Sequence, residues 1–360
     1  MHIAIVCRAL GVPGAVASIA LRQARELTRH ARITLVSDSL PDGIDWAEKA
    51  RVPMPDLHAL RRFRHVPDEV LFGRGVNRAL RSLHDVDFIL AHAHSAAHIG
   101  ARGLGIPFGF FVHGDIFDRP TGTYDSRLTA FYQWIAPRAY RSADVVFALA
   151  PYLAEKVRER GARYVEVVPN GIDPADLGVR ETKAVAAAAA LRMITVGRLS
   201  IEKGIEHLFA ACRLLEIDYE LTIAGSGPLE AQLRESAPRH VTFLGAVPRH
   251  QLGALYARHD LFVTATLNEA FALVVLEALA CGLPVAGTDI DALRAVIVDG
   301  ENGLLVPPRD PRAMANAIER VARDRALREH LASNARASVA QYNWPAIGDR
   351  IAEVIRRMLA

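Results

Sequence analysis

Short apolar runs alternate with helix-like segments along this 360-residue chain, and no other feature constrains its fold as strongly. Between the runs, apolar residues recur at helical spacing. The expected strands lie at residues 2–6, 32–36, 88–92, 108–112, 145–148 and 165–168, then at 192–196, 220–224, 241–243, 261–264, 285–287 and 304–306. Strands that alternate with helices form parallel sheets covered by helices on both faces. The sequence therefore predicts an α/β fold.

The two series of strands predict two doubly wound, Rossmann-like domains that face each other across a cleft. The turn-forming cluster Pro169-Asn170-Gly171 and an alanine run at 186–190 separate the two series. A helix with Pro345 in its first turn is expected to follow the last strand and to return toward the N-terminal domain. The expected N-terminal domain, linker, C-terminal domain and final helix span residues 1–168, 169–190, 191–342 and 343–360.

Composition and charge argue against several classes of protein. A net charge of +3 is nearly neutral for a chain of this size, so we expect no nucleic-acid partner. Cys7, Cys212 and Cys281 are far apart, which fits a reducing compartment better than a disulfide framework or a zinc site. The chain opens into an apolar run without a charged leader, and charges interrupt every long apolar run. We therefore expect a soluble, cytoplasmic protein.

Two glutamates, Glu269 and Glu277, bracket an apolar run in the second half. If the run is a helix, Glu277 lies on an apolar face, where burying a lone carboxylate costs several kcal/mol unless a donor meets it. Glu269 precedes the helix, so its side chain can meet a ligand together with the helix N-terminus. Two interpretations stay open: a ligand-binding pair, or a structural ion pair at Glu277 with a helix-entry charge at Glu269.

Loops at strand ends should carry the chemistry, because open α/β sheets bind ligands where strands end and helices begin. Arg198 and Lys203 follow the strand at 192–196, beside a glycine-bearing turn that enters a helix. Two fixed cations, free backbone amides and a helix N-terminus can hold a diphosphate without a metal. The alternative is a pair of solvated surface cations.

Other short motifs suggest a different enzyme or a metal. Gly225-Ser226-Gly227 resembles half of a dinucleotide fingerprint, which would suit an NAD-dependent oxidoreductase, but it lacks the third glycine and follows the second strand of its domain. Such an enzyme also needs an acidic residue that ends its second strand near a full glycine fingerprint, and Asp38 supplies only the acidic residue. Asp85 with Asp87, and Asp289 with Asp291, have a spacing that can hold a metal on a sugar nucleotide. We interpret both pairs as incidental and expect neither metal nor cofactor.

A longer series of motifs points to one family. The second half carries, in order, Gly197-Arg198-Leu199, Lys203-Gly204, Gly225-Ser226-Gly227-Pro228, Phe243-Leu244-Gly245, the Glu269 and Glu277 pair, Cys281-Gly282-Leu283-Pro284-Val285, Asp299-Gly300 and Asn302-Gly303-Leu304-Leu305-Val306. The first half carries Pro13-Gly14, Gly105-Ile106-Pro107, His113-Gly114 and Pro169-Asn170-Gly171-Ile172-Asp173. Together these motifs resemble the retaining GT-B glycosyltransferases of family 4, over nearly the whole chain.

The resemblance implies a hexosyltransferase that uses a UDP or GDP sugar and a hydroxyl acceptor, with retention and without a metal. In the implied front-face mechanism the leaving phosphate accepts the proton of the incoming hydroxyl, so no protein nucleophile is needed. Glu277 would bind the ribose, while His113 and Glu269 would be catalytic groups at the reacting sugar. The other implied substrate-binding positions are Gly14, Arg198, Lys203, Gly227, Val247, Phe271, Ala272, Leu273 and Val274. Of these, the cations and the amides of Leu273 and Val274 would hold the diphosphate.

The chain departs from the family pattern near the implied donor sugar. Glu269-Ala270-Phe271-Ala272 stands where Glu-Gly-Phe-Gly is usual. A methyl group at Ala272 would crowd the sugar if that backbone needs a positive φ. Asp291, Ala292 and Ala295 replace a usual pair of glycines with a nearby glutamate. We therefore expect an enzyme of unusual specificity, with a non-catalytic nucleotide-sugar-binding module on the same fold as an alternative.

Residues 51–81 are the expected acceptor-side and membrane-facing segment. Its arginines outnumber its acidic residues, Asp56, Asp68 and Glu69, and are Arg51, Arg61, Arg62, Arg64, Arg74, Arg78 and Arg81. In related enzymes this part of the chain faces the acceptor and often a membrane, and a basic amphipathic segment attracts anionic lipid headgroups. A solvated helix face with ordinary salt bridges explains the pattern equally well. The acceptor is a glycan, a glycolipid or a small molecule, and peripheral attachment to the inner face of the plasma membrane is one expectation.

Overall fold

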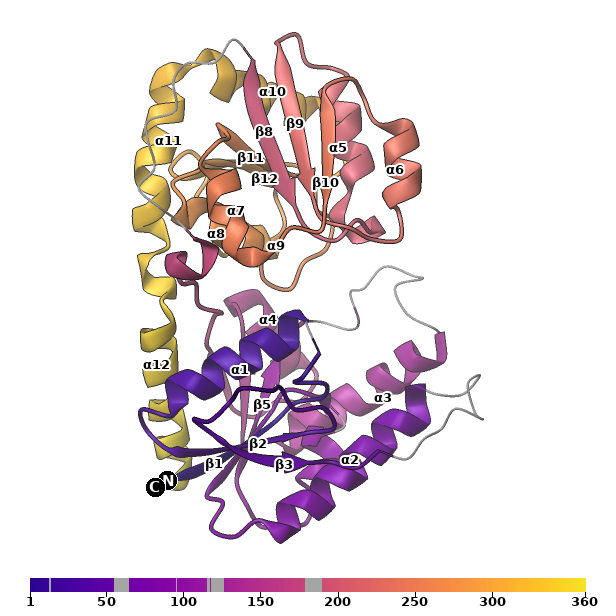
Figure 1. Cartoon of the computed structure of the whole chain (residues 1–360), viewed down its shortest axis with the longest axis vertical. Helices are drawn as coiled ribbons and strands as arrows, with labels where there is room; N and C mark the ends of the chain where they lie inside the picture. Colours follow the sequence, from indigo (N-terminus) through magenta and orange to yellow (C-terminus); the bar gives the residue numbers. More distant parts are fainter. Residues whose placement is uncertain (13, 55–64, 95, 115–116, 118–125, 179–189) are drawn as a thin grey trace. The chain divides into compact units, whose positions relative to one another are not determined.

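The computed structural model describes residues 1–360 except 13, 55–64, 95, 115–116, 118–125 and 179–189. The chain divides into two compact units, one made of residues 1–170 with 344–360 and the other of residues 171–343. Each unit contains its own parallel sheet covered by helices (Figure 1). Residues 171–178, inside the segment expected as a linker, belong to the second unit and include the short 3-10 helix η3 (Pro174–Leu177).

The first unit contains a sheet of seven described strands in the order β3-β2-β1-β4-β5-β6-β7. The strands are β1 (His2–Val6), β2 (Arg32–Ser37), β3 (Glu48–Arg51), β4 (Phe88–Ala91), β5 (Phe108–Val112), β6 (Val145–Ala148) and β7 (Val165–Val167). All of them pair in parallel, as predicted. The prediction missed β3, because this edge strand is charged and largely exposed and so lacks the apolar run that marks the others.

Helices cover both faces of this first sheet (Figure 1). They are α1 (Ala15–Leu27), α2 (His65–Ser82), the π-helix η2 (Ala96–Gly100), α3 (Ser126–Ser142), α4 (Pro151–Glu159) and α12 (Trp344–Leu359). The last helix, α12, packs against α1 although the whole second unit separates them in sequence. Gly348 permits this close packing, since a Cβ atom there would lie 2.6 Å from the Cβ of Glu26. Arg29 adds an ion pair with Asp349 at 2.7 Å.

The second unit contains a sheet of six described strands in the order β10-β9-β8-β11-β12-β13. The strands are β8 (Leu191–Val196), β9 (Tyr219–Ala224), β10 (Val241–Gly245), β11 (Leu261–Thr264), β12 (Val285–Thr288) and β13 (Gly303–Val306), and all pair in parallel. Strand order reverses between β8 and β11, so the helices that follow these strands leave toward opposite faces. This reversal creates a crevice at the carboxyl ends of the two strands, where such sheets bind ligands.

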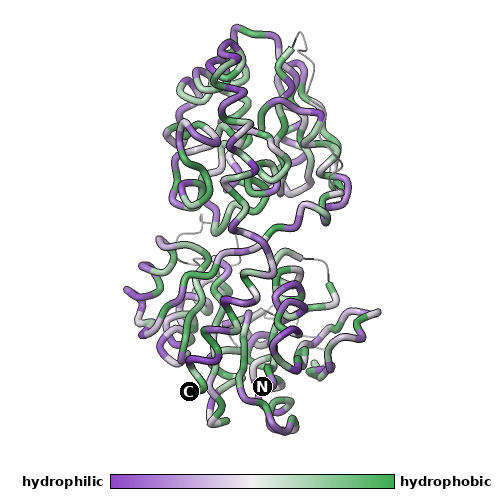
Figure 2. The backbone as a smooth tube through the Cα atoms, turned by 90° about the vertical axis from the view of Figure 1, so that its left-hand side faces the viewer, coloured by the Kyte–Doolittle hydropathy of each residue, from purple (hydrophilic) through white to green (hydrophobic). Residues whose placement is uncertain are grey.

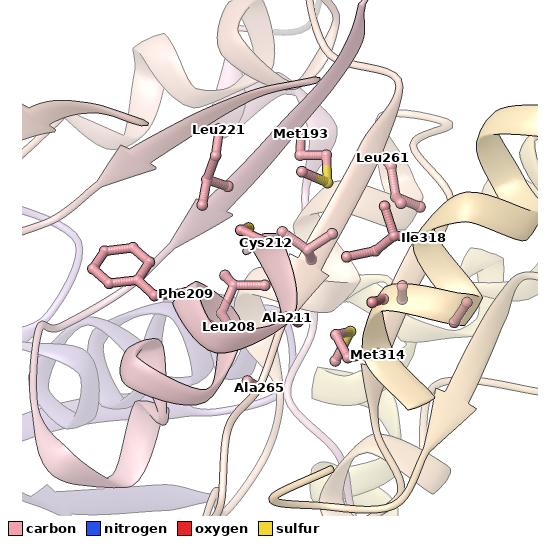
Figure 3. Close-up of a cluster of buried hydrophobic side chains, with 14 of the residues drawn as sticks. Met193, Leu208, Phe209, Ala211, Cys212, Leu221, Leu261, Ala265, Met314 and Ile318 are labelled. Atoms are coloured by element: carbon pink, nitrogen blue, oxygen red, sulfur yellow. The ribbon is translucent and has the colours of Figure 1, made fainter. Parts of the chain in front are cut away.

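Helices of the second unit bury the apolar side chains of this sheet. They are α5 (Ile205–Cys212), α6 (Glu230–Ser236), α7 (Arg249–Tyr256), α8 (Leu273–Ala280), α9 (Asp291–Arg294), α10 (Pro311–Arg323) and α11 (Arg325–Ser338), with the 3-10 helices η3, η4 (Ile201–Lys203) and η5 (Ala340–Tyr342). Met193, Leu208 and Ile318 are among the side chains that meet between the sheet, α5 and α10 (Figure 3). The carboxylate of Asp310 accepts a bond from the Ala313 N–H and so fixes the start of α10.

Hydrophobic and hydrophilic stretches alternate along the backbone of both units (Figure 2). This is the pattern of helices that bury one face and of strands covered by helices. Among the described helices, none combines the length and the apolar character that crossing a bilayer requires.

Candidate functional site

A pocket lies at the carboxyl ends of β8 and β11, at the point where the strand order of the second sheet reverses. The predicted site residues that line it are Arg198, Lys203, Glu269, Ala272 and Val274. Backbone and side-chain atoms of Thr195, Val196, Gly197, Leu199, Ile205, Ile223, Thr264, Thr266, Val275 and Leu293 complete the lining. The structure thus brings these predicted residues together from loops that are far apart along the chain.

The turn that carries Lys203 is anchored on the strand-end loop of β11. The Leu267 N–H donates to the Glu202 carbonyl at 2.7 Å, and the Thr266 hydroxyl donates to the same carbonyl at 3.0 Å. Gly204 ends the turn with a φ of 60°, and a Cβ atom there would lie 2.2 Å from the Ala265 carbonyl oxygen. Glycine is therefore required, both for this left-handed conformation and for the close approach.

Lys203 and Glu269 form an ion pair inside the pocket. The Lys203 ammonium donates to Glu269 Oε2, while the Ala270 N–H donates to Glu269 Oε1 at 3.2 Å. Arg198 on the same rim is exposed, and no side-chain partner is found for it among the described residues. The pocket therefore contains one cation already balanced by a carboxylate and a second cation that faces solvent.

Glu277 lies about one turn after the first residue of α8 and is only 4% exposed. Its Oε1 atom lies 2.8 Å from Nη2 of Arg249, and its Oε2 atom accepts a 3.4 Å bond from the Tyr256 hydroxyl. Burial raises the pKa of Glu277, while the Arg249 charge and the Tyr256 bond oppose that shift. The ion pair that one interpretation expected at this residue is therefore present, and its cation comes from α7.

The backbone at the start of α8 has a negative φ and makes a tight turn at Ala272. Ala272 has a φ of −78°, so the positive φ on which the expected crowding by its methyl group depends is absent. The Leu273 N–H donates to the Phe271 carbonyl at 2.8 Å, so this amide, expected at the diphosphate, is engaged here. The Phe271 side chain is buried edge-on against Tyr342. The Val275 and Leu276 N–H groups both donate to the carbonyl of the N-cap residue Ala272 at 3.0 Å.

Gly227, a predicted residue of the second unit, has an evident packing role. A Cβ atom on Gly227 would lie 2.3 Å from the Leu199 carbonyl oxygen, and one on Gly225 would lie 1.8 Å from that of Gly197. These glycines let the loop after β9 contact the backbone of the loop after β8, which explains them without a dinucleotide. Val247 is half-buried in the loop between β10 and α7, two residues before Arg249.

In the first unit, His113 follows β5 and His92 follows the neighbouring strand β4. His92 Nδ1 and His113 Nε2 lie 2.8 Å apart, and the two rings stack with centroids separated by 5.1 Å. Burial and the nearby His94 lower the pKa of His113 to about 3, and burial with His113 lowers the pKa of His92 well below its ordinary value. Both rings are therefore neutral near pH 7, and one ring nitrogen donates to the other. Sequence reasoning missed His92, although histidines after adjacent strands are a detectable signal.

Among the described residues of the first unit, no close contact requires a glycine at position 14, at the start of α1. Its φ is −177°, an extended value open to any residue, and an added Cβ atom would meet nothing closer than the Val12 carbonyl oxygen at 4.0 Å. Its predicted contact with a ligand stays a prediction.

Arg8, which follows β1, joins three carboxylates that the sequence did not connect. Its guanidinium lies 3.4 Å from Asp38, 3.8 Å from Asp68 and 2.5 Å from Glu69. Asp38 also accepts a 2.7 Å bond from the Ala9 N–H. Asp38 is therefore engaged by the loop after β1, which counts against the ribose contact that an oxidoreductase would require of it.

The acidic pair Asp289 and Asp291 is also engaged. Arg294 lies 2.6 Å from Asp289 and 3.3 Å from Asp291. Within the described ranges, no three His, Cys, Asp or Glu side chains are arranged to hold a metal.

The expected membrane segment is described only in part. Arg61, Arg62 and Arg64 lie outside the described residues. On α2, Arg81 donates to the Asn77 side chain at 3.0 Å, as a solvated helix face would allow.

Comparison with known proteins identifies the family of the chain. Residues 16–176 match the model of Glycosyltransferase Family 4, and residues 184–338 match that of Glycosyl transferases group 1. An uncharacterized glycosyltransferase of Methanocaldococcus jannaschii is 30% identical over 293 residues, which are 75% of each chain. A phosphatidyl-myo-inositol mannosyltransferase of Mycobacterium leprae is 28% identical over 98% of this chain and 96% of its own.

Solved structures show the same fold. The sucrose-phosphate synthase of Thermosynechococcus elongatus superposes with a TM-score of 0.83 at 22% identity, over 99% of this chain and 98% of its own. An Anabaena protein solved with UDP-glucose superposes with a TM-score of 0.75 at 21% identity, over 99% of this chain and all of its own. The predicted GT-B architecture is thus confirmed. The chain belongs to the family 4 glycosyltransferases, also described as glycosyl transferases group 1, and is a transferase.

Proposed function

We propose that this enzyme transfers a hexose from a UDP sugar to a hydroxyl group of a glycan or glycolipid, with retention and without a metal. The observation that carries the proposal is the pocket at the reversal of the second sheet, where Arg198, Lys203 and Glu269 meet. UDP is favoured over GDP because the similar Anabaena protein was solved with UDP and with UDP-glucose. A glycolipid acceptor is suggested by the mannosyltransferase relative. Membrane contact through residues 51–81 stays a prediction.

The pocket suits a diphosphate because both cationic side chains and a helix N-terminus offer it positive charge. Arg198 is exposed on its rim and Lys203 lies within hydrogen-bonding distance of Glu269. The first turn of α8 adds the positive end of a helix dipole. As the bond to the sugar breaks, negative charge grows on the leaving phosphate, and fixed cations stabilise that charge more than they stabilise the bound substrate.

The two glutamates would divide the donor between them. Glu269, beside Lys203, would hold the sugar, and Glu277, deeper on α8, would accept bonds from the ribose hydroxyls. His113, neutral in its buried stack with His92, would contact the reacting sugar as an uncharged hydrogen-bonding group. In the front-face reaction the acceptor hydroxyl gives its proton to the leaving phosphate oxygen, so no side chain must act as nucleophile.

The central test is a thermal-shift comparison of UDP, GDP and NAD. A ligand that binds the native state raises the melting temperature, and saturation at one hundred times Kd stabilises by about 2.7 kcal/mol. We expect a clear shift with UDP, a smaller one with GDP and none with NAD. A shift with NAD and none with either nucleoside diphosphate would favour the oxidoreductase. Retention is tested by the anomeric configuration of the product in an NMR spectrum.

Metal independence gives a second test. Asp289 and Asp291 are already paired with Arg294, and the cations of the pocket can balance the diphosphate. Activity should therefore survive EDTA at full rate. Loss of activity with EDTA and its recovery with manganese would overturn the metal-free mechanism and would point to Asp289 and Asp291 as ligands.

A further inference from the structure

Arg249 is a charged residue next to the candidate site to which the proposed function gives no role. It is the first residue of α7, and its side chain is 41% exposed, whereas the Glu277 side chain that it contacts is 6% exposed. The pair therefore connects a cation at the surface to a carboxylate inside the second unit. The 2.8 Å distance between Nη2 and Oε1 is that of a charge-assisted hydrogen bond.

We propose that Arg249 is a positioning residue that keeps the Glu277 carboxylate ionised and oriented to accept both ribose hydroxyls of the donor. This inference rests on the proposed ribose role of Glu277.

Among the described residues, two donors contact the Glu277 carboxylate, one on each oxygen. A carboxylate has about four lone-pair positions, two on each oxygen. Arg249 occupies one on Oε1 and the Tyr256 hydroxyl occupies one on Oε2, at 2.8 and 3.4 Å. One position on each oxygen is then open for two hydroxyl donors. Arg249 is for this reason a support for the ligand and not a competitor.

The charge of Arg249 also favours the ionised form of Glu277. Burial raises the pKa of Glu277, and the Arg249 charge is the larger of the two influences that oppose the rise. A protonated carboxyl group would turn one acceptor into a donor and would mismatch the ribose diol. Without Arg249, protonation of Glu277 would therefore begin at a higher pH.

The other groups near Glu277 cannot replace this charge. Tyr256 of α7 and Cys281 after α8 both have pKa values raised by burial, so both are neutral near pH 7. Arg336 of α11 acts on Cys281, and the 3-10 helix η3 that packs on α8 carries the acidic Asp176. In the described part of the chain, Arg249 is thus the cation that acts on Glu277.

Backbone packing fixes the start of α7, where Arg249 lies. Gly178, at the end of η3, approaches the His250 carbonyl so closely that an added Cβ atom would lie 2.3 Å from its oxygen. Gly178 also has a φ of 66°, which favours glycine. This contact holds the first turn of α7 on η3, which itself packs against α8. The pair is consequently held by the fold on both sides.

The test is calorimetric titration of UDP at pH 6, 7 and 8 with Arg249→Gln, Arg249→Lys and Glu277→Gln. We expect Arg249→Gln to weaken UDP binding about tenfold at pH 7, more at pH 6 and less at pH 8, relative to the wild type at the same pH. The ratio at each pH cancels the titration of UDP itself. Arg249→Lys keeps the charge and should recover most of the affinity. Arg325→Gln, which removes an exposed arginine paired with Glu329 on α11, is the matched control and should bind UDP normally.

Three outcomes would overturn the inference. Tighter UDP binding by Arg249→Gln would make Arg249 a competitor of the ribose. An equal deficit at every pH, without recovery by Arg249→Lys, would leave only a packing role. Unchanged UDP binding by Glu277→Gln would overturn the ribose contact of the proposed function together with the inference. A melting curve would reveal whether Arg249→Gln fails to fold. In that case the pH dependence of UDP binding by Arg249→Lys tests the inference. An ammonium group makes a weaker contact than a guanidinium group, so the loss of UDP affinity should be smaller but should again be larger at pH 6 than at pH 8.

Discussion

The carboxyl ends of β8 and β11 in the second unit differ in chemistry from those of β4 and β5 in the first. The former carry ionised groups, with Lys203 paired to Glu269 and Arg198 exposed beside them. The latter end in His92 and His113, which are stacked, buried and neutral. Both sheets are parallel, and the groups that differ lie in the loops at the strand ends. One end suits a multiply charged ligand, and the other suits an uncharged hydroxyl.

The largest effect should come from Glu269→Gln. This change keeps the size of the side chain and removes the charge that we propose to face the reacting sugar, where positive charge would grow in the transition state. We expect kcat to fall on the order of a hundredfold, with UDP affinity nearly unchanged. Steady-state kinetics with the full donor and calorimetry with UDP separate the two quantities. A loss of UDP affinity at normal kcat would mean that the charge serves the nucleotide instead.

A smaller effect is expected from Lys203→Gln, which tests whether the charged end recognises the diphosphate. Losing one charge-assisted contact of about 2 kcal/mol should weaken UDP binding roughly thirtyfold. Binding of uridine, which has no phosphate, should not change. If uridine and UDP lose affinity equally, Lys203 acts through its ion pair with Glu269 and through the shape of the pocket. The charged strand ends of the second unit would then not differ from the neutral strand ends of the first unit in recognising a diphosphate by its charge.

The smallest expected effect is that of His113, at the neutral strand ends of the first unit, on kcat and on its pH profile. Because burial lowers the pKa of His113 to about 3, its ring takes up a proton only far below neutrality. The pH profile of kcat between 5.5 and 8.5 should therefore show no inflection from His113. His113→Asn should lower kcat by roughly fivefold at every pH in this range, as expected for one lost neutral hydrogen bond. An inflection near pH 6.5 that disappears in the variant would show that the ring titrates during turnover.

The sequence predicted the strands of both sheets well because parallel strands covered on both faces need uninterrupted apolar runs. It failed at β3, where the charged residues Glu48, Lys49 and Arg51 pair at a sheet edge and need no apolar run. Strand boundaries elsewhere agree to within one or two residues. Local pattern was thus sufficient wherever burial dictates residue type.

The sequence named residues that meet in the pocket, such as Lys203 and Glu269, but it did not predict which side chains would pair. Lys203 and Glu269 are 66 positions apart, and nothing local indicates that their side chains meet. Burial of Glu277 followed from its apolar face, yet the identity of its cation, Arg249, depends on how α7 packs on α8. The local sequence predicts which residues are charged and which are buried, whereas the tertiary structure determines which side chains pair.

Because α12 belongs to the first unit, the second unit is inserted into the sequence of the first. Residues 171–343 leave and rejoin the first unit at neighbouring points, since the Ile172 N–H donates to the Tyr342 carbonyl at 2.6 Å and Ile172 bridges to Asn343. The second unit can therefore be exchanged as one contiguous segment for that of a relative, whereas a chain cut at residue 170 would lack the helix that covers α1. Chimaeras joined at these two points would keep the histidine end while replacing the charged one.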